Sequence, residues 1–120
     1  MKQPETLPSE FLQDGWCQRS NAIDRKGKDV SPQSSDACQW CIEGATMAAG
    51  LNVGNFFGSH CDYGLRTSDT QKLEFWTYLT GLIQATGTKC PYQWNDHPHR
   101  TQDEVIFIIK QAEHHMGWQK

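Results

Sequence analysis

The sequence lacks a long apolar run and lacks a block of charge of one sign. No stretch approaches the roughly 20 apolar residues needed to span a bilayer, and the opening MKQPETLPSE lacks the apolar core of a signal peptide. The 11 basic and 14 acidic residues give a formal net charge of -3, which argues against a surface that follows nucleic-acid phosphates. We therefore expect a soluble, cytoplasmic protein whose partner is neither a membrane nor a nucleic acid.

Cysteines are few and odd in number. The five present do not have the spacing of a disulfide framework, so we expect free thiols in a reducing compartment. Cys38 and Cys41 form a Cys-x-x-Cys pair that could hold zinc if His60 and Cys61, or Cys90, completed a tetrahedron. The spacing to those residues does not match a zinc ribbon or finger. Buried thiols are the better interpretation, and we assign no metal and no cofactor.

The chain length bounds the architecture. A chain of 120 residues falls within the usual single-domain range and buries about two-thirds of the surface that its unfolded form exposes. Hydrophobic content is a modest 37%, but five Trp, five Phe and three Tyr supply large buried areas. No repeat and no linker indicates a second unit. We expect one domain over residues 1–120.

Residues 36–51, DACQWCIEGATMAAGL, organise the rest of the chain. They are apolar on nearly every side, and Glu43 is the only charge after Asp36. A helix without a polar face belongs inside a fold. The sequence therefore predicts a buried central helix over residues 36–50, opened by a capping box from Asp36 to Gln39.

Three further segments carry helix signals. Helices are predicted over residues 8–14, 69–86 and 101–116 from their apolar periodicity and their flanking capping or glycine residues. The clearest capping box pairs Thr101 with Glu104. Together with the central helix, these segments predict a mainly α fold, a compact bundle of about four helices around the buried central one.

Two segments read as connections. A small hairpin near residues 22–31 is predicted from the turn-forming RKGK sequence at residues 25–28, which two short apolar pairs flank. Residues 90–100 are predicted to be a loop, because Pro91 and Pro98 interrupt them. Residues 52–67 carry too many glycines for a helix, and a loop of this length is usually functional or packed by its own aromatic rings.

Four sequence blocks carry a resemblance. They are Gly15-Trp16-Cys17-Gln18; Trp40-Cys41 with Gly44-Ala45; Trp94-Asn95-Asp96; and Arg100-Thr101 with Glu104-Val105, and Ala22, Asp24, Gly27 and Val30 lie between the first two. In this order, over about residues 11–112, the chain resembles a family of small uncharacterised domains encoded by bacteria, notably actinobacteria, and their phages. The resemblance implies a compact, mainly helical domain in a genomic setting where phage accessory proteins are common. The chain departs from the pattern at Arg19, where a glycine is usual.

Several block residues suit a ligand pocket. Trp40, Trp94, Asn95 and Arg100 could capture a small anionic or nucleotide ligand by stacking and guanidinium contacts, with Glu43 as a further polar group. The structural alternative is that Asn95 bonds its own turn. In the same alternative, Glu43 pairs with Arg100, with Arg19 or with a tryptophan N–H.

An enzyme is a further alternative. Asp96, His97 and His99 resemble an acid/base cluster, and Cys17 or Cys41 could act as a nucleophile if the fold brought them together. A catalytic pair needs a mutual contact that sequence proximity does not establish, so no catalytic residue is assigned and the non-enzymatic interpretation is preferred.

The preferred interpretation is a small, non-enzymatic binding protein of phage or mobile-element type, an inhibitor that docks on a host protein and blocks or redirects it. We expect its interface in the glycine-rich residues 52–67, with Phe56, Phe57 and Tyr63 as anchors, because large aromatic side chains usually dominate the energy of an interface. The sequence does not indicate an oligomeric state.

Overall fold

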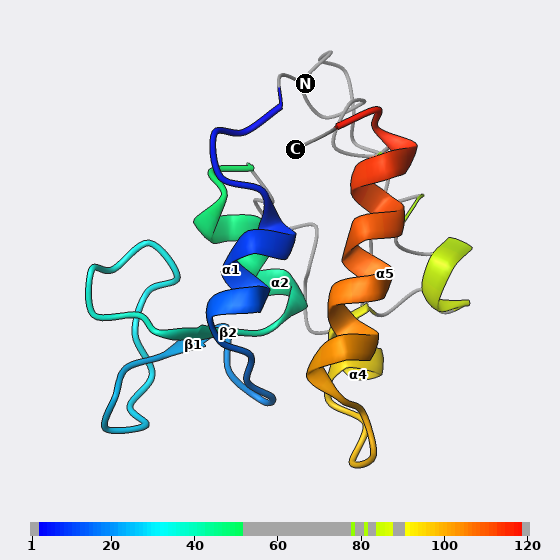
Figure 1. The fold of residues 1–120 in the computed structure, drawn as a ribbon. Coiled ribbons are helices and arrows are strands. Elements are labelled where there is room, and N and C mark those ends of the chain that lie inside the picture. The colour runs from blue at the N-terminus through cyan, green and yellow to red at the C-terminus, as the bar shows by residue number, and fades with distance from the viewer. Residues whose placement is uncertain (1–2, 52–77, 79–80, 82–83, 88–90, 119–120) are drawn as a thin grey trace, which may run out of the picture.

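The computed structural model describes residues 3–51, 78, 81, 84–87 and 91–118. In chain order, its elements are α1 (Pro8–Asp14), β1 (Ala22–Ile23), β2 (Gln39–Trp40), α2 (Ile42–Ala48), α4 (Pro91–Asn95) and α5 (Gln102–His115). Figure 1 shows α1 and α5 upright and antiparallel, with α2 close to α1, α4 at the lower end of α5, and the small sheet at the foot of α1. No helix among these residues is long and apolar enough to cross a membrane.

Helices α1 and α5 are joined at both ends. The carboxylate of Glu113 on α5 accepts hydrogen bonds from the backbone N–H and the hydroxyl of Ser9, both at 2.7 Å. Because Ser9 lies in the first turn of α1, this carboxylate satisfies a helix N–H that has no partner within the helix. At the other end, the side-chain amide of Gln102 donates to the carbonyl of Leu12 at 2.7 Å. These contacts fix the two helices antiparallel.

Helix α5 begins where the sequence predicts. The Thr101 hydroxyl accepts from the backbone N–H of Glu104 at 3.3 Å, and the Glu104 carboxylate accepts from the backbone N–H of Thr101 at 3.0 Å. This reciprocal pair confirms the predicted capping box. The predicted helix over residues 8–14 is likewise found, as α1.

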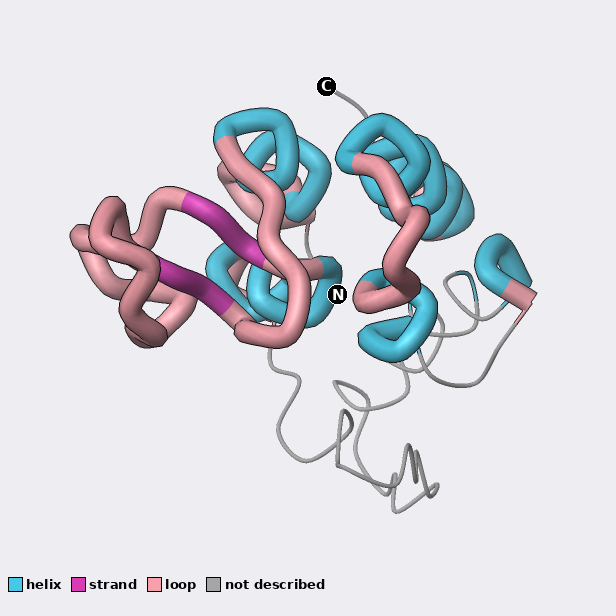
Figure 2. The backbone as a smooth tube through the Cα atoms, turned by 90° about the horizontal axis from the view of Figure 1, so that it is seen from below, coloured by secondary structure: helices cyan, strands magenta, loops and turns pink. Residues whose placement is uncertain are grey.

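The sheet joins segments that are far apart in the chain. Strands β1 and β2 pair antiparallel, with Ala22 opposite Trp40 and Ile23 opposite Gln39. Trp16 adds a parallel bridge to Trp40. Of the predicted hairpin near residues 22–31, the structure contains one antiparallel bridge, from Ile23 to Asp29. The strand that pairs with β1 is β2, which comes later in the chain. In Figure 2, the loops that leave the two strands extend away from the helices.

The predicted compact bundle of about four helices around a buried central helix is wrong. Within residues 36–50, only Ile42–Ala48 is helical, and Gln39–Trp40 is a strand. The expected capping box from Asp36 to Gln39 is therefore also wrong. The cap is Cys41, whose sulfur accepts from the N–H of Gly44 at 3.2 Å. An apolar run fits a buried strand as well as a buried helix, and here cross-strand pairing claims its first part.

Two other predictions also need comment. The predicted loop over residues 90–100 is wrong in its first half, which forms the short helix α4. Proline is well suited to the first turn of a helix, so Pro91 begins α4 instead of excluding a helix.

The helix predicted over residues 69–86 lies largely outside the described residues. Those that are described in this range, 78, 81 and 84–86, are helical.

The core lies between α1, α2, β2 and α5. It comprises Leu7, Leu12, Ala22, Trp40, Ile42, Ala45, Leu51, Tyr78, Val105, Ile109, Ala112 and Trp118. Aromatic contacts mark its two sides. The ring of Phe11 meets Trp40 edge to face at 5.1 Å between centroids, and Tyr78 stacks on Trp118 at 5.6 Å. The buried hydroxyl of Tyr78 lies 3.0 Å from the hydroxyl of Thr46 on α2, which satisfies both groups.

Candidate functional site

Asn95, at the end of α4, holds the region together. Its side chain is fully buried and uses all four hydrogen-bonding positions of the amide. The oxygen accepts from the indole N–H of Trp16 at 2.9 Å and from the backbone N–H of Ile42 at 3.0 Å. The nitrogen donates to the carbonyl of Cys17 at 3.2 Å and to Asp96 at 2.9 Å. Asn95 therefore fixes the chain after α1, the start of α2 and the end of α4 to one another.

The segment after Trp16 is also anchored on the turn that follows α4. The side-chain amide of Gln18 donates to the carbonyls of Asn95 and His97 at 3.0 and 2.8 Å. The Asp96 carboxylate accepts from the backbone N–H of Arg19 at 2.9 Å. Arg19 has φ +67°, a conformation in which glycine is the least strained residue. A glycine, which the resemblance implies is usual at this position, would adopt this conformation without strain.

A close backbone approach places Asn21 against the start of α2. The N–H of Cys41 donates to the carbonyl of Asn21 at 3.2 Å. A Cβ atom at Gly44 would overlap that same carbonyl, so only glycine fits there. The thiol of Cys41 points to the Asn21 side-chain oxygen at 3.6 Å. The start of α2 and the chain before β1 thus form one continuous surface.

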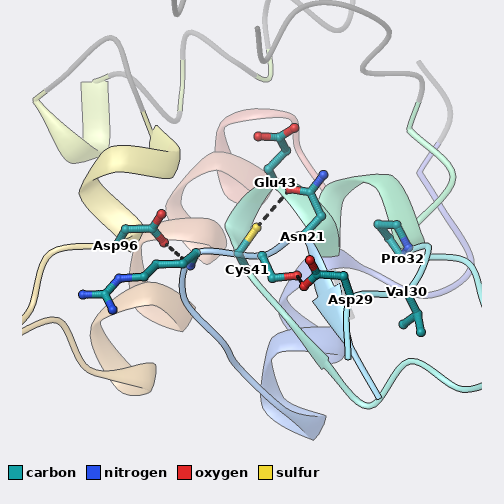
Figure 3. Close-up of a pocket in the computed structure, with 9 residues that line it drawn as sticks. Asn21, Asp29, Val30, Pro32, Cys41, Glu43 and Asp96 are labelled. Atoms are coloured by element: carbon teal, nitrogen blue, oxygen red, sulfur yellow. Dashed lines mark hydrogen bonds between the residues drawn. The ribbon is translucent and has the colours of Figure 1, made fainter. Parts of the chain in front are cut away.

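This surface forms one wall of a pocket of about 500 Å³, which we call the acidic pocket. Its lining residues are Arg19, Ser20, Asn21, Asp29, Val30, Pro32, Cys41, Glu43 and Asp96. In the view of Figure 3, Asp96 lies on one side of Cys41, and Asp29 and Pro32 lie on the other. Three carboxylates and one guanidinium line the cavity, so its character is acidic.

Glu43 is the carboxylate of this pocket for which the described part of the chain supplies no hydrogen-bond donor. The Asp29 carboxylate accepts from the hydroxyl of Ser20 at 2.7 Å, and Asp96 accepts two hydrogen bonds. By contrast, no donor among the described residues bonds the half-buried carboxylate of Glu43. Burial and, to a lesser degree, the charge of Asp96 raise the pKa of Glu43 to about 7. The carboxyl group of Glu43 therefore changes charge near neutral pH.

The thiols of Cys17 and Cys41, near this pocket, are unreactive at neutral pH. The Cys17 thiol donates to the carbonyl of Ser20 at 3.4 Å, and burial, with smaller contributions from nearby acidic groups, raises its pKa to about 11. Burial raises the pKa of Cys41 to about 12, against the opposing effect of the hydrogen bond from Gly44. Since the thiolate is the nucleophilic form, neither sulfur is activated at neutral pH in this environment.

The structure separates the residues that the sequence grouped as a ligand site. Trp40 is buried, with its indole N–H on the carbonyl of Pro32 at 3.0 Å. Trp94 and Arg100 contact each other, the guanidinium carbon lying 3.8 Å from the ring centroid. Arg100 also donates to the Trp94 carbonyl and pairs with Glu104. Of the five residues predicted to bind a ligand, only Glu43 lines the acidic pocket. Asn95 contributes indirectly, because its side chain bonds the lining residue Asp96.

Other predicted sites fall outside the described residues. Phe56, Phe57 and Tyr63, expected as interface anchors, lie there, as do His60 and Cys61 of the zinc alternative. Within the part of the chain that is described, no group of three or more His, Cys, Asp or Glu side chains could hold a metal ion.

Sequence reasoning missed Asn21 and Asp29 as site residues. Asn21 lies in the bend before β1, and Asp29 forms the isolated bridge to Ile23. Neither belongs to a motif, and the pairing of β1 with β2 brings both near the start of α2. Asp96 was noticed as part of an acid/base cluster with His97 and His99. The structure places both histidine rings at the surface, while Asp96 faces Arg19 and lines the pocket.

Comparison with known proteins adds a family and no activity. No curated protein and no solved structure matches the chain. One family profile does match, and it is described as a family of unknown function, DUF6197. It covers residues 11–115, close to the whole chain and to the extent of the four sequence blocks. The resemblance to a family of uncharacterised domains is therefore confirmed, and this chain belongs to DUF6197.

Proposed function

We propose that this protein is a non-enzymatic binding protein of phage or mobile-element type, which docks on a host protein and blocks or redirects it. A basic side chain of that partner enters the acidic pocket and pairs with Glu43. The phage setting comes from the resemblance in sequence, and the docking chemistry comes from the pocket.

The observation that supports docking is that no described residue donates a hydrogen bond to Glu43. A half-buried carboxylate without a hydrogen bond is unfavourable, and a lysine or arginine from outside would supply both a donor and the opposite charge. The carboxylates of Asp29 and Asp96 line the same cavity and add to the attraction. Among the described residues of the lining, Arg19 is the only basic one. A cationic group therefore suits this cavity better than an anionic one.

The remaining chemistry favours binding over catalysis. The raised pKa values of Cys17 and Cys41 leave both thiols protonated near neutral pH, so a thiol enzyme receives no support. The Trp94 ring and the Arg100 guanidinium are engaged with each other, so they offer less to an anionic or nucleotide ligand. Phe56, Phe57 and Tyr63 remain part of the proposal as aromatic anchors of the interface.

Capture from a lysate of the bacterial host, followed by cross-linking and mass spectrometry, tests the proposal. The parent should capture a partner through a cross-linked lysine-rich or arginine-rich segment, and Glu43→Lys should lose it. Asp14→Lys is the matched control, since it makes the same charge change at an exposed residue outside the pocket. Capture should also be stronger at about pH 8 than at about pH 6, because Glu43 has a pKa of about 7.

A second variant tests the aromatic anchors. Replacing Phe56 and Phe57 by serine should abolish capture and leave the circular dichroism and melting temperature near those of the parent. A partner that is retained by Glu43→Lys and by this double variant would show that docking uses another surface. A purified protein that turns over a substrate would contradict the non-enzymatic assignment.

A further inference from the structure

A second cavity is lined by the chain between strands β1 and β2. It has a volume of about 590 Å³ and lies between the turn at residues 24–28 and the loop at residues 35–38. Both segments belong to the loops that project from the strands in Figures 1 and 2. We call it the basic cleft. It shares no lining residue with the acidic pocket, so the two are separate sites.

Three cations line the basic cleft from one turn. Arg25, Lys26 and Lys28 are exposed, and no carboxylate in the described part of the chain forms an ion pair with them. The chain as a whole carries a formal charge of -3, so this concentration of positive charge runs against the overall composition. With Asp24 and Asp36, the described lining carries three positive and two negative side chains, so it keeps a net positive charge that favours an anionic ligand.

Asp24 offsets part of this positive charge, but its carboxylate is bonded to the backbone of the turn and not to the three cationic side chains. One oxygen of its carboxylate accepts from the backbone N–H groups of Lys26 and Lys28, at 2.8 and 2.9 Å. The N–H of Asp24 in turn donates to the carbonyl of Lys28 at 2.9 Å. These bonds fix the backbone that carries the three cationic side chains, so the site is built in advance of a ligand.

The opposite wall gives the cleft its limits. Ser35 can donate a hydroxyl hydrogen bond, while Asp36 is an exposed carboxylate whose charge opposes an anion. Ala37 and Cys38 are the apolar lining residues, and no aromatic ring is among the described residues that line the cavity. These residues offer no ring on which a nucleobase could stack. Recognition would rest on charge and hydrogen bonds alone.

We propose that the basic cleft binds a small ligand that carries two or more phosphate groups, of the size of a polyphosphate or a bisphosphorylated sugar. Guanidinium and ammonium groups are the side chains that bind phosphate best, arginine as a planar fork and lysine as a point charge. The volume lies in the range of small-molecule sites. A long nucleic acid is a poor fit, because the chain is acidic outside this turn.

Titration with sodium tripolyphosphate at about 150 mM salt, followed by calorimetry and by amide NMR shifts, tests the proposal. Binding should be sub-millimolar, with shifts concentrated in residues 24–28 and 35–38. Lys26→Gln and Lys28→Gln should each weaken binding by about three- to tenfold. Lys110→Gln is the matched control, since Lys110 is exposed on α5 outside the cleft, and it should change affinity little.

Asp36→Asn provides a test in the opposite direction. It removes the opposing charge from the cleft wall, so it should tighten binding by about twofold or more. Citrate, a polyanion without phosphate, should bind much more weakly than tripolyphosphate. The proposal is overturned if no binding occurs at about 10 mM probe, if Lys110→Gln weakens binding as much as Lys26→Gln does, or if Asp36→Asn has no effect. Equal affinity for citrate would overturn the assignment to phosphate.

Discussion

Removing the side chain of Asn95 should destabilise this fold more than any exposed change on α4. Asn95→Ala leaves three groups without their partner: the N–H of Ile42, the carbonyl of Cys17 and the indole N–H of Trp16. A buried polar group without a partner costs about 1–3 kcal/mol. The first two groups are buried, whereas the half-exposed Trp16 can turn to water. We therefore expect the free energy of unfolding to fall by about 3–5 kcal/mol.

Urea unfolding followed by tryptophan fluorescence measures this loss. A whole domain of this kind is stable by about 5–15 kcal/mol, so the variant should be partly unfolded or melt far below the parent. Gln93→Ala is the control, because Gln93 is exposed on the same helix and its substitution should change stability by less than about 0.5 kcal/mol. If Asn95→Ala is no less stable than Gln93→Ala, the buried amide does not hold these segments together.

Asn95→Asp separates lost hydrogen bonds from lost volume. An ionised aspartate keeps the shape of asparagine but turns an acceptor toward the Cys17 carbonyl and toward Asp96, where the parent has a donor. Protonation restores one donor. The deficit of this variant relative to the parent should therefore shrink as the pH falls, whereas that of Asn95→Ala should change little.

Two further predictions concern the acidic pocket. The raised pKa of Glu43, about 7 against 4.5 for the free group, means that ionisation is less favourable in the folded chain, so the parent loses stability as the pH rises from 4.5 to 7. Because Glu43 is only half-buried, the free energy of unfolding of Glu43→Gln should exceed that of the parent by about 1–2 kcal/mol at about pH 8 and should equal it below pH 4.5. Urea unfolding in which this difference does not grow with pH would contradict the prediction. Arg19→Gly should raise the free energy of unfolding by about 0.5–1 kcal/mol, because glycine adopts the backbone angle φ of +67° without strain, whereas Arg19→Ala should not raise it. Equal melting temperatures for the two variants would show that the backbone at Arg19 is not strained.

The parts of the fold that sequence predicts are those set by local contacts. The start of α5 rests on Thr101 and Glu104, three residues apart, and both halves of their capping box form. The start of α2 rests instead on distant contacts. Trp40 pairs with Ala22 and bridges to Trp16, so it enters a strand although its neighbours are helix formers. The local sequence does not indicate the strand at Gln39–Trp40, so the central helix was predicted to begin several residues too early.

The candidate site shows the same division. Of the residues predicted to form a ligand pocket, only Glu43 lines the acidic pocket, and it was singled out because a charge inside an apolar segment is conspicuous in a sequence. Several of the donors considered for Glu43 have other partners: Arg100 contacts Trp94 and Glu104, and the indole N–H groups of Trp40 and Trp16 bond Pro32 and Asn95. Which donor reaches a carboxylate depends on how remote segments cross, and spacing in the chain does not contain that information.

The four blocks that carry the resemblance are used by the fold. Trp16, Gly44 and Asn95, one from each of the first three blocks, meet around the start of α2, and Thr101 with Glu104 from the fourth opens α5. The residues proposed to bind partners lie mostly between the blocks. Glu43 and Asp29 line the acidic pocket, and Arg25, Lys26 and Lys28 line the basic cleft. In this chain the blocks therefore supply contacts that hold the scaffold together, and the proposed binding chemistry rests mainly on other residues. Asp96, which belongs to a block, bonds Asn95 and also lines the acidic pocket.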